Sequence, residues 1–164
     1  MSVIIRHAEL SDAAALQAIY QQPSIYANTL QLPYQSLSHW QALCQPTAGF
    51  YNLVAELDGK LVGQLGLQQL QNQRRRHVAD IGMAVSELYQ GQGIGSALLR
   101  SALEMADNWL NIHRLELQVY SSNEAAVALY ERFGFEVEAE LTDFAFQYGR
   151  YVNVLQMARI MSSR

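Results

Sequence analysis

Three glycines, Gly91, Gly93 and Gly95, stand at alternate positions directly ahead of a stretch whose apolar residues recur at helical spacing. The first turn of a helix carries N–H groups without partners and a partial positive charge. Glycines at that point remove the Cβ atoms that would keep an anion away from these donors. The segment therefore predicts a binding site for a phosphate or a pyrophosphate.

The neighbours of the glycines narrow the kind of anion site. A Walker loop requires a lysine next to its last glycine, and the only lysine of the chain is Lys60, far upstream. A dinucleotide fingerprint requires a further glycine where this chain has Ser96, and a strand that opens directly into the glycines, whereas residues 86–90 intervene here. A glycine-rich turn without any ligand remains an alternative.

A second segment, residues 123–135, combines an asparagine, a tyrosine and a closing glycine. Asn123 precedes Tyr130 by seven residues, and a Gly-Phe pair at Gly134 and Phe135 closes the segment. Asn123 predicts the N-cap of a helix, and Gly134 predicts its left-handed end. A tyrosine on such an amphipathic helix is, in the simplest interpretation, a core residue with a satisfied hydroxyl.

Together the two segments carry a family resemblance. Residues 83–99 resemble the acetyl-CoA loop of the GNAT superfamily of N-acetyltransferases, whose pattern Gln/Arg-x-x-Gly-x-Gly/Ala is filled by Gln90, Gly93 and Gly95. Residues 123–135 are similar to the second block of that family, and the order of strands and helices agrees over nearly the whole chain. Within the superfamily the chain looks most like a bacterial L-amino-acid N-acetyltransferase branch. The resemblance implies transfer of an acetyl group to a primary amine, such as the α-amino group of an apolar L-amino acid.

The resemblance also implies where acetyl-CoA lies as the cosubstrate. Its pantetheine arm is expected to pair with the backbone of residues 83–85, and its pyrophosphate is expected on the N–H groups of residues 90–96. Backbone groups bear this binding, so the side chains there are loosely constrained. The residues implied for the cosubstrate are Met83, Ala84, Val85, Gln90, Gly91, Gln92, Gly93, Ile94, Gly95, Ser96, Asn123 and Tyr130.

Amine attack on a thioester requires a neutral amine, stabilisation of an oxyanion and a proton for the departing thiolate. The resemblance implies an oxyanion donor among the strand amides near Met83 or Ala84, and it implies Tyr130 as the proton donor. A phenol with a reference pKa of about 10 can protonate a thiolate whose conjugate acid has a pKa of about 8.5, once both lie in a dry site.

The candidate base is Asp80, which aligns with the strand position where some family members place a catalytic glutamate. A carboxylate in an otherwise apolar strand requires a reason for its presence. Asp80 could instead face solvent, or pair with one of the arginines at 74–76. Another family position for the base is filled by Gln118, which cannot take a proton. Water-mediated deprotonation, or an amine that arrives neutral, therefore stays open.

The acceptor side is assigned, by analogy with the family, to the loop between the first two helices and to the C-terminal hairpin. Tyr26, Asn28 and Tyr34 in that loop, together with Asp80, are the candidate substrate-binding residues. Aromatic residues there suit an apolar or aromatic group on the amine, and they suit core packing almost as well. Alternative acceptors are a protein N-terminus, a polyamine or an antibiotic amine. A non-catalytic acyl-CoA-binding module is the alternative function.

The elements that position these residues alternate between strands and helices. Asp58 and Gly59 predict a two-residue hairpin between two strands. Residues 24–36 lack a period and predict a loop, and the long helix after the glycines is expected to reach Trp109 and Leu110. We expect a mixed α+β fold, with a mostly antiparallel, splayed sheet of about seven strands flanked by four helices.

Length and composition exclude several other classes of protein. A chain of 164 residues with 50% hydrophobic content predicts a single domain over residues 1–164. No apolar run approaches the roughly 20 residues of a membrane span, and a net charge of −4 argues against nucleic acid as a partner. Cys44 is the only cysteine, and with the four scattered histidines it gives no metal-ligand spacing. We expect a cytoplasmic enzyme without a metal. The oligomeric state is not readable from the sequence, and the resemblance leaves a homodimer through the tail hairpin open.

Overall fold

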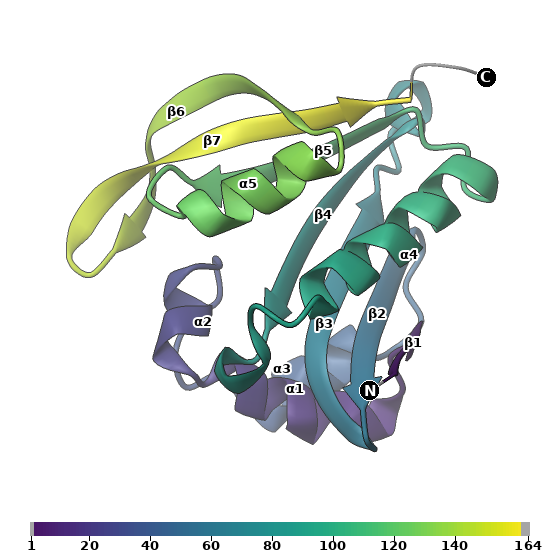
Figure 1. Ribbon diagram of the computed structural model, residues 1–164, viewed down its shortest axis with the longest axis vertical. Coiled ribbons are helices and arrows are strands. Elements are labelled where there is room, and N and C mark those ends of the chain that lie inside the picture. The colour runs from purple at the N-terminus through teal and green to yellow at the C-terminus, as the bar shows by residue number, and fades with distance from the viewer. Residues whose placement is uncertain (1, 162–164) are drawn as a thin grey trace.

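The computed structural model describes residues 2–161, and within this range the chain forms seven strands and five α-helices around one sheet (Figure 1). The strands are β1 (Val3–His7), β2 (Phe50–Leu57), β3 (Lys60–Gln69), β4 (Val78–Val85), β5 (Arg114–Tyr120), β6 (Glu136–Gln147) and β7 (Arg150–Ile160). The helices are α1 (Ala13–Tyr20), α2 (Pro23–Ala27), α3 (Leu37–Leu43), α4 (Ile94–Asn108) and α5 (Glu124–Arg132). Single 3-10 turns lie at Leu10–Asp12, Gln73–Arg75 and Glu87–Tyr89.

The sheet has the order β1-β2-β3-β4-β5-β7-β6, and every neighbouring pair is antiparallel except β4 and β5. The predicted mixed fold with a mostly antiparallel seven-stranded sheet is therefore confirmed. The hairpin predicted at Asp58 and Gly59 forms, and the C-terminal hairpin turns at Tyr148 and Gly149. Asp58 and Gly59 adopt φ values of 51° and 78°, and Tyr148 and Gly149 adopt 51° and 75°. Both pairs have the left-handed backbone that a two-residue turn requires.

Helices cover both faces of the sheet, which explains why the central strands are apolar on both sides. On β2, Leu53 and Ala55 join the core under α4, whereas Val54 joins a second core with Leu16 of α1 and Trp40 of α3. In Figure 1, α4 and α5 lie in front of the sheet, and α1 and α3 lie at its lower end. The glycine segment leads into α4, and α2 lies beside it, because the Gln22 side chain bonds to Ser86 and Ser24 bonds to Glu87.

Two helix boundaries differ from the sequence-based expectation. Residues 23–27 form the short helix α2, which Pro23 begins, instead of a loop. The long helix α4 ends at Asn108, so the prediction that it includes Trp109 and Leu110 is wrong. Trp109 is 77% exposed, and its indole Nε1 donates to Glu104 at 3.0 Å. Its spacing matched the apolar stripe, but the backbone leaves the helix at this residue.

The sheet opens between β4 and β5. These parallel strands pair only over Val78–Asp80 and Arg114–Glu116. Beyond that point β4 stays paired with β3 as far as Val85, and β5 stays paired with β7 as far as Tyr120. Figure 1 shows the two strands diverging, and the predicted splay beside residues 82–85 is confirmed. Asp80 and Glu116 form the last pair before the strands separate.

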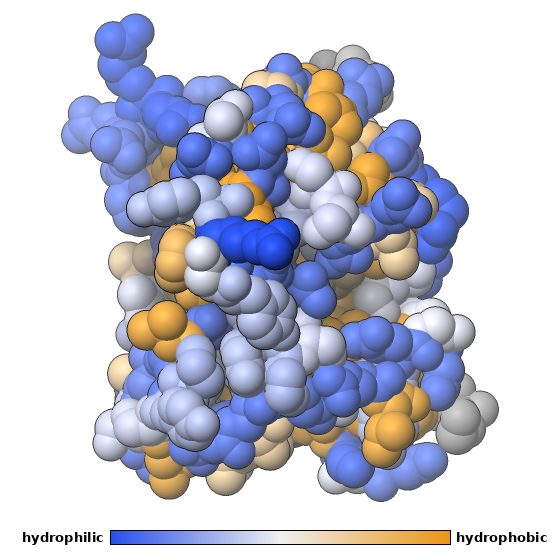
Figure 2. Space-filling model, turned by 90° about the vertical axis from the view of Figure 1, so that its left-hand side faces the viewer, coloured by the Kyte–Doolittle hydropathy of each residue, from blue (hydrophilic) through white to orange (hydrophobic). Residues whose placement is uncertain are grey.

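No helix within residues 2–161 is long and apolar enough to cross a membrane. Figure 2 shows the end of the molecule that carries the tip of the β6–β7 hairpin. Hydrophilic residues predominate on this face, and hydrophobic residues form small, separate groups.

Candidate active site

Two cavities meet at the opening between β4 and β5. One, here termed the loop cavity, has a volume of about 500 Å³ and is lined by the glycine segment, the end of β4 and α5. The other, the sheet cavity, has a volume of about 450 Å³ and lies over β3, β4 and β5 on the side of α1 and α3. Six residues line both cavities: Asn28, Thr29, Met83, Asn123, Ala126 and Tyr130. Two molecules, one in each cavity, would therefore meet at these residues.

The glycine segment leaves open space in front of its backbone. Gly93 is the N-cap of α4 with a φ of 84°, and Gly91 has a φ of 73°. A Cβ atom built at either glycine would meet no atom within 4 Å. The left-handed backbone explains why glycine stands there, and the open space leaves the neighbouring N–H groups accessible. Gln90 fixes the start of the segment, because its Nε2 donates to the Val85 carbonyl at 3.0 Å.

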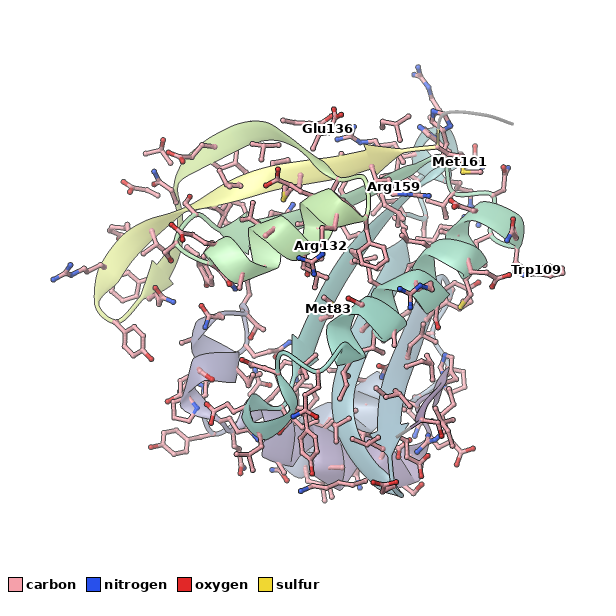
Figure 3. All side chains as sticks on the ribbon, in the orientation of Figure 1. Met83, Trp109, Arg132, Glu136, Arg159 and Met161 are labelled. Carbon is pink, nitrogen blue, oxygen red and sulfur yellow. The ribbon has the colours of Figure 1, made fainter. Side chains whose placement is uncertain are left out.

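The start of α4 supplies donors to the loop cavity. Gly93, the N-cap, has no side chain that could cap the helix. Its carbonyl accepts a hydrogen bond from the Ala97 N–H at 3.0 Å. The N–H groups of residues 94–96 therefore have no partner inside the helix. Arg132 of α5 is the only charged side chain among the described residues that line this cavity. In Figure 3 the Arg132 side chain extends from α5 in the direction of Met83.

Tyr130 lies where the two cavities meet. Its residue is only 7% exposed, and its ring packs edge-on against Phe135 with centroids 5.7 Å apart. None of the side-chain hydrogen bonds within the described part of the chain involves its hydroxyl, and the residue lines both cavities. Burial raises the pKa of Tyr130 to about 12. The phenol is therefore protonated at neutral pH, and its hydroxyl is free to donate to a bound molecule.

Asn123 sets the position of the helix that carries Tyr130. Its Oδ1 accepts from the Ala126 N–H at 3.2 Å, which confirms the predicted N-cap of α5. At the other end of α5, Gly134 has a φ of 92°, as expected of a left-handed terminator. Seven residues correspond to about two helical turns, so Asn123 and Tyr130 face the same side. This arrangement brings both of them to the junction of the cavities.

Asp80 lies at the apex of the opening and lines the sheet cavity. Its Oδ1 is buried and has no hydrogen-bond partner within residues 2–161. Burial raises the pKa of Asp80, and the charge of Glu116 raises it further, while Arg75 acts in the opposite direction. The ion pair considered for Asp80 is made by its neighbour instead, because Arg75 donates to Glu116 at 2.9 Å. The arrangement leaves Asp80 free to accept a proton.

The structure brings together most, but not all, of the residues implied for the site. Gln92 lies outside the lining of the loop cavity, and its Nε2 donates to the Leu88 carbonyl at 3.2 Å. Asn28 lines both cavities, whereas Tyr26 and Tyr34 line neither, and Tyr34 is 94% exposed. The other residues implied for the cosubstrate line the loop cavity: Met83, Ala84, Val85, Gln90, Gly91, Gly93, Ile94, Gly95, Ser96, Asn123 and Tyr130.

Sequence reasoning missed the walls of the sheet cavity. Tyr20 and Trp40 stack at 4.5 Å between ring centroids, and Phe50 lines the cavity from β2. Gln64 and Gln68 of β3 also line it, at alternate positions of one strand face. The period of two was readable from the sequence, but which face lines a cavity depends on the splay and on α1. Among the described residues, no cluster of three His, Cys, Asp or Glu side chains could hold a metal ion.

Comparison with known proteins identifies the family. Residues 14–135 match the model of the Acetyltransferase (GNAT) family. The chain is 42% identical over 158 residues to the L-amino acid N-acetyltransferase AaaT of Escherichia coli, covering 96% of this chain and 98% of that protein. A GNAT-family acetyltransferase from Streptococcus pneumoniae superposes with a TM-score of 0.86 at 28% identity, over 98% of this chain and 100% of that one.

A third protein, YncA from Salmonella typhimurium, has the same fold, with a TM-score of 0.85 at 22% identity over 100% of this chain and 96% of that one; its structure contains its cofactor acetyl-CoA. The matched segment covers the glycine loop, the capped helix with Tyr130 and the opening between β4 and β5. The chain therefore belongs to the GNAT family of acetyltransferases.

Proposed function

We propose that this acetyltransferase acetylates the α-amino group of an apolar L-amino acid, with acetyl-CoA in the loop cavity and the amino acid in the sheet cavity. The observation that carries the proposal is the junction of the two cavities at Met83 and Tyr130. A donor and an acceptor approaching from opposite sides would meet there. The L-amino acid N-acetyltransferase activity of the 42% identical relative supports this choice of acceptor.

The loop cavity fits acetyl-CoA, whose thioester supplies the acetyl group when it is bound. The N–H groups of residues 94–96 would hold its pyrophosphate at the start of α4, and the open space beside Gly91 and Gly93 would admit it. Arg132 would add a positive charge for a phosphate in a chain whose net charge is −4. The backbone of residues 83–85 would hold the pantetheine arm.

The backbone of β4 would also stabilise the oxyanion. Successive N–H groups of a strand point to opposite sides, so one of the two at Met83 and Ala84 points away from β3. β5 has already separated from β4 at this level, so that N–H has no partner in the sheet. It is therefore free to donate to the developing negative charge of the acetyl oxygen.

The proton transfers would use Tyr130 and Asp80. Tyr130 has a free hydroxyl at the junction, and with a pKa of about 12 it is protonated at every pH of a normal assay. It would donate to the departing sulfur. Asp80 lies three residues before Met83, about 10 Å along the strand, so it would accept the proton of the amine through bridging water. The raised pKa of Asp80 brings this carboxyl closer to neutral pH than an ordinary aspartate.

The charge of the sheet cavity favours an acceptor with one amine over a polyamine. Asp80 is the only charged side chain among the described residues that line this cavity. A polyamine carries several positive charges, and burying them would require several carboxylates. The aromatic rings of Trp40, Phe50 and Phe144 instead offer an apolar surface.

Release of free thiol from acetyl-CoA, measured with a panel of amines, tests the proposed function. The panel contains glycine, L-alanine, L-leucine, L-phenylalanine, L-tryptophan, L-lysine and spermidine. We expect thiol release that depends on the added amine and is fastest with an apolar L-amino acid. Faster release with spermidine would contradict the acceptor proposal. Binding of acetyl-CoA without release under any amine would identify an acyl-CoA-binding module instead.

We propose further that residues 1–164 act as one domain, in the cytoplasm and without a metal ion. One sheet that carries both cavities supports a single domain. The lone, buried Cys44 is consistent with a reducing compartment. The Tyr130 hydroxyl at the junction and the Asp80 carboxylate in the sheet cavity supply the acid and the base of the proposed proton transfers. Sedimentation of the purified protein tests whether two copies associate through the β6–β7 hairpin.

A further inference from the structure

We infer that Gly66 and Gly82 form the floor of a subsite for a broad, apolar group next to the acceptor amine, and that these two glycines set the size of the amines accepted. This inference rests on the proposed function, because it assigns the acceptor to the sheet cavity. The residues that carry it lie on β3 and β4 and were not implicated by either signature segment.

The two glycines face each other across neighbouring strands. Gly66 of β3 pairs with Gly82 of β4, and both line the sheet cavity. Neither has a positive φ, so the backbone at these positions does not require glycine. Glycine in the interior of a strand lowers stability and often marks a place where another molecule approaches the backbone. The pair exposes bare backbone over two strands, about 4.8 Å apart.

The space above Gly82 is wider than the space above Gly66. A Cβ atom built at Gly82 meets nothing within 4 Å, so this part of the floor is open. A Cβ atom at Gly66 would lie 3.0 Å from Cε1 of Phe50 and 3.5 Å from Nε2 of Gln64. The floor therefore begins wide beside Met83, where the amine reacts, and narrows at Gly66 between a ring edge and an amide.

A rigid wall stands beside this floor. The Tyr20 ring stacks on Trp40 at an interplanar angle of 20°, and the Tyr20 hydroxyl donates to Gln64 Oε1 at 2.6 Å. Gln64 Nε2 donates in turn to Asn52 Oδ1 at 2.7 Å, and Asn52 Nδ2 donates to the Leu43 carbonyl at 3.2 Å. This buried chain of hydrogen bonds ties the aromatic stack to β3 and β2, so the wall cannot easily retreat from a bulky ligand.

The chemistry of the slot defines the group it fits. Its walls are aromatic rings and the hydrogen-bonded amide of Gln64, and its floor is the backbone of two glycines. A flat group would bury its faces against these surfaces without displacing them. The subsite therefore favours amines with an aromatic or broad aliphatic group close to the amino group, such as the side chains of tryptophan, phenylalanine and leucine.

The test compares Gly82→Ala with wild-type enzyme on a large and a small acceptor. The added methyl group enters the open floor, where no protein atom opposes it, so folding should be preserved. We expect the KM for L-tryptophan or L-phenylalanine to rise about 10- to 100-fold, and the KM for L-alanine to change less than about threefold. The KM for acetyl-CoA and the melting temperature should be unchanged. Gly66→Ala should act in the same direction, because its methyl group would occupy the narrow end of the slot, 3.0 Å from the Phe50 ring.

A matched control uses a third glycine of the same strand. Gly63 faces α4 instead of the sheet cavity, and its Cβ atom would lie 3.1 Å from Leu98 and 3.2 Å from Ile94. Gly63→Ala should therefore lower the melting temperature while leaving the ratio of KM values for the large and small amines unchanged.

The outcomes separate the subsite from the function. If Gly82→Ala affects L-tryptophan and L-alanine equally, or affects neither, while the wild type acetylates both, the subsite assignment is wrong and the proposed function stands. If the wild type releases no thiol with any amine, the proposed function fails and the subsite fails with it. Amine-dependent turnover with selective loss of the large acceptor supports both.

Discussion

Replacing Tyr130 with phenylalanine removes one hydroxyl group and almost no volume. The Tyr130 ring contacts Phe135, and none of the side-chain hydrogen bonds within residues 2–161 involves the Tyr130 hydroxyl. Folding therefore loses no internal hydrogen bond, and the free energy of unfolding should change by less than about 1 kcal/mol. The loss should appear in catalysis, because the variant has no proton to give to the departing sulfur at the junction of the two cavities.

The expected size of that loss follows from the geometry. General acid catalysis is typically worth about 10²- to 10⁴-fold, and the kcat of Tyr130→Phe should fall within that range when the chemical step limits turnover. Thiol release at saturating acetyl-CoA and amine measures kcat, and a viscosity series establishes that product release is not limiting. Tyr51→Phe is the matched control, since Tyr51 is a partly buried tyrosine of β2 that lines neither the loop cavity nor the sheet cavity.

Two results would refute this reasoning about Tyr130. An unchanged kcat, with chemistry shown to be rate-limiting, would leave water as the proton source. A raised KM for acetyl-CoA at an unchanged kcat would make Tyr130 a packing residue of the loop cavity. The pKa of about 12 adds a further check, because the wild-type rate should show no loss from tyrosine ionisation below about pH 11.

Four further predictions concern three other residues of the site, Asp80, Arg132 and Tyr20. Because the pKa of Asp80 is raised and a base acts in its ionised form, wild-type kcat/KM should rise with pH through that raised pKa; Asp80→Asn should lose this rise and about 10²-fold in rate above it. The native state holds the Asp80 proton more tightly than the unfolded chain does, so wild-type stability relative to Asp80→Asn should decline as pH rises from about 4 toward the raised pKa, in denaturant titrations. In steady-state kinetics, Arg132→Gln should raise the KM for acetyl-CoA about tenfold without changing kcat. The ratio of the KM for 3′-dephospho-acetyl-CoA to the KM for acetyl-CoA should be smaller in this variant than in the wild type. Tyr20→Phe leaves the buried Gln64 Oε1 without its donor and should lower the free energy of unfolding by about 1–3 kcal/mol.

Local patterns in the sequence predicted the elements whose formation is decided locally. The hairpin at Asp58 and Gly59 follows from two residues that tolerate a positive φ, and the Asn123 cap follows from a side chain that reaches an N–H three residues ahead. Trp109 shows the limit of such patterns. Its position suits the apolar face of α4, but the helix ends one residue earlier, and the indole instead donates to Glu104.

The walls of the sheet cavity could not be predicted in the same way. Tyr20, Trp40, Gln64 and Phe50 come from four elements, and their proximity depends on how α1 and α3 pack on the sheet. Tyr34 was predicted to bind the acceptor because it is an aromatic residue of the loop assigned to the acceptor side, but it is 94% exposed and lines neither cavity. Composition alone does not distinguish a loop tyrosine that faces solvent from a helix tyrosine that faces a cavity.

The divergence of β4 and β5 links the separate parts of the site. Pairing ends at Asp80 and Glu116, and each strand keeps its other neighbour, so the sheet stays intact on both sides of the opening. The opening leaves one of the N–H groups at Met83 and Ala84 without a partner in the sheet, places Asp80 at its apex, and lets Tyr130 of α5 line both cavities. An uninterrupted β4–β5 ladder would pair those donors and separate the two cavities. The break in pairing is therefore the feature from which the oxyanion donor, the base and the acid of the proposed mechanism all follow, and it is set by strand topology that neither signature segment encodes.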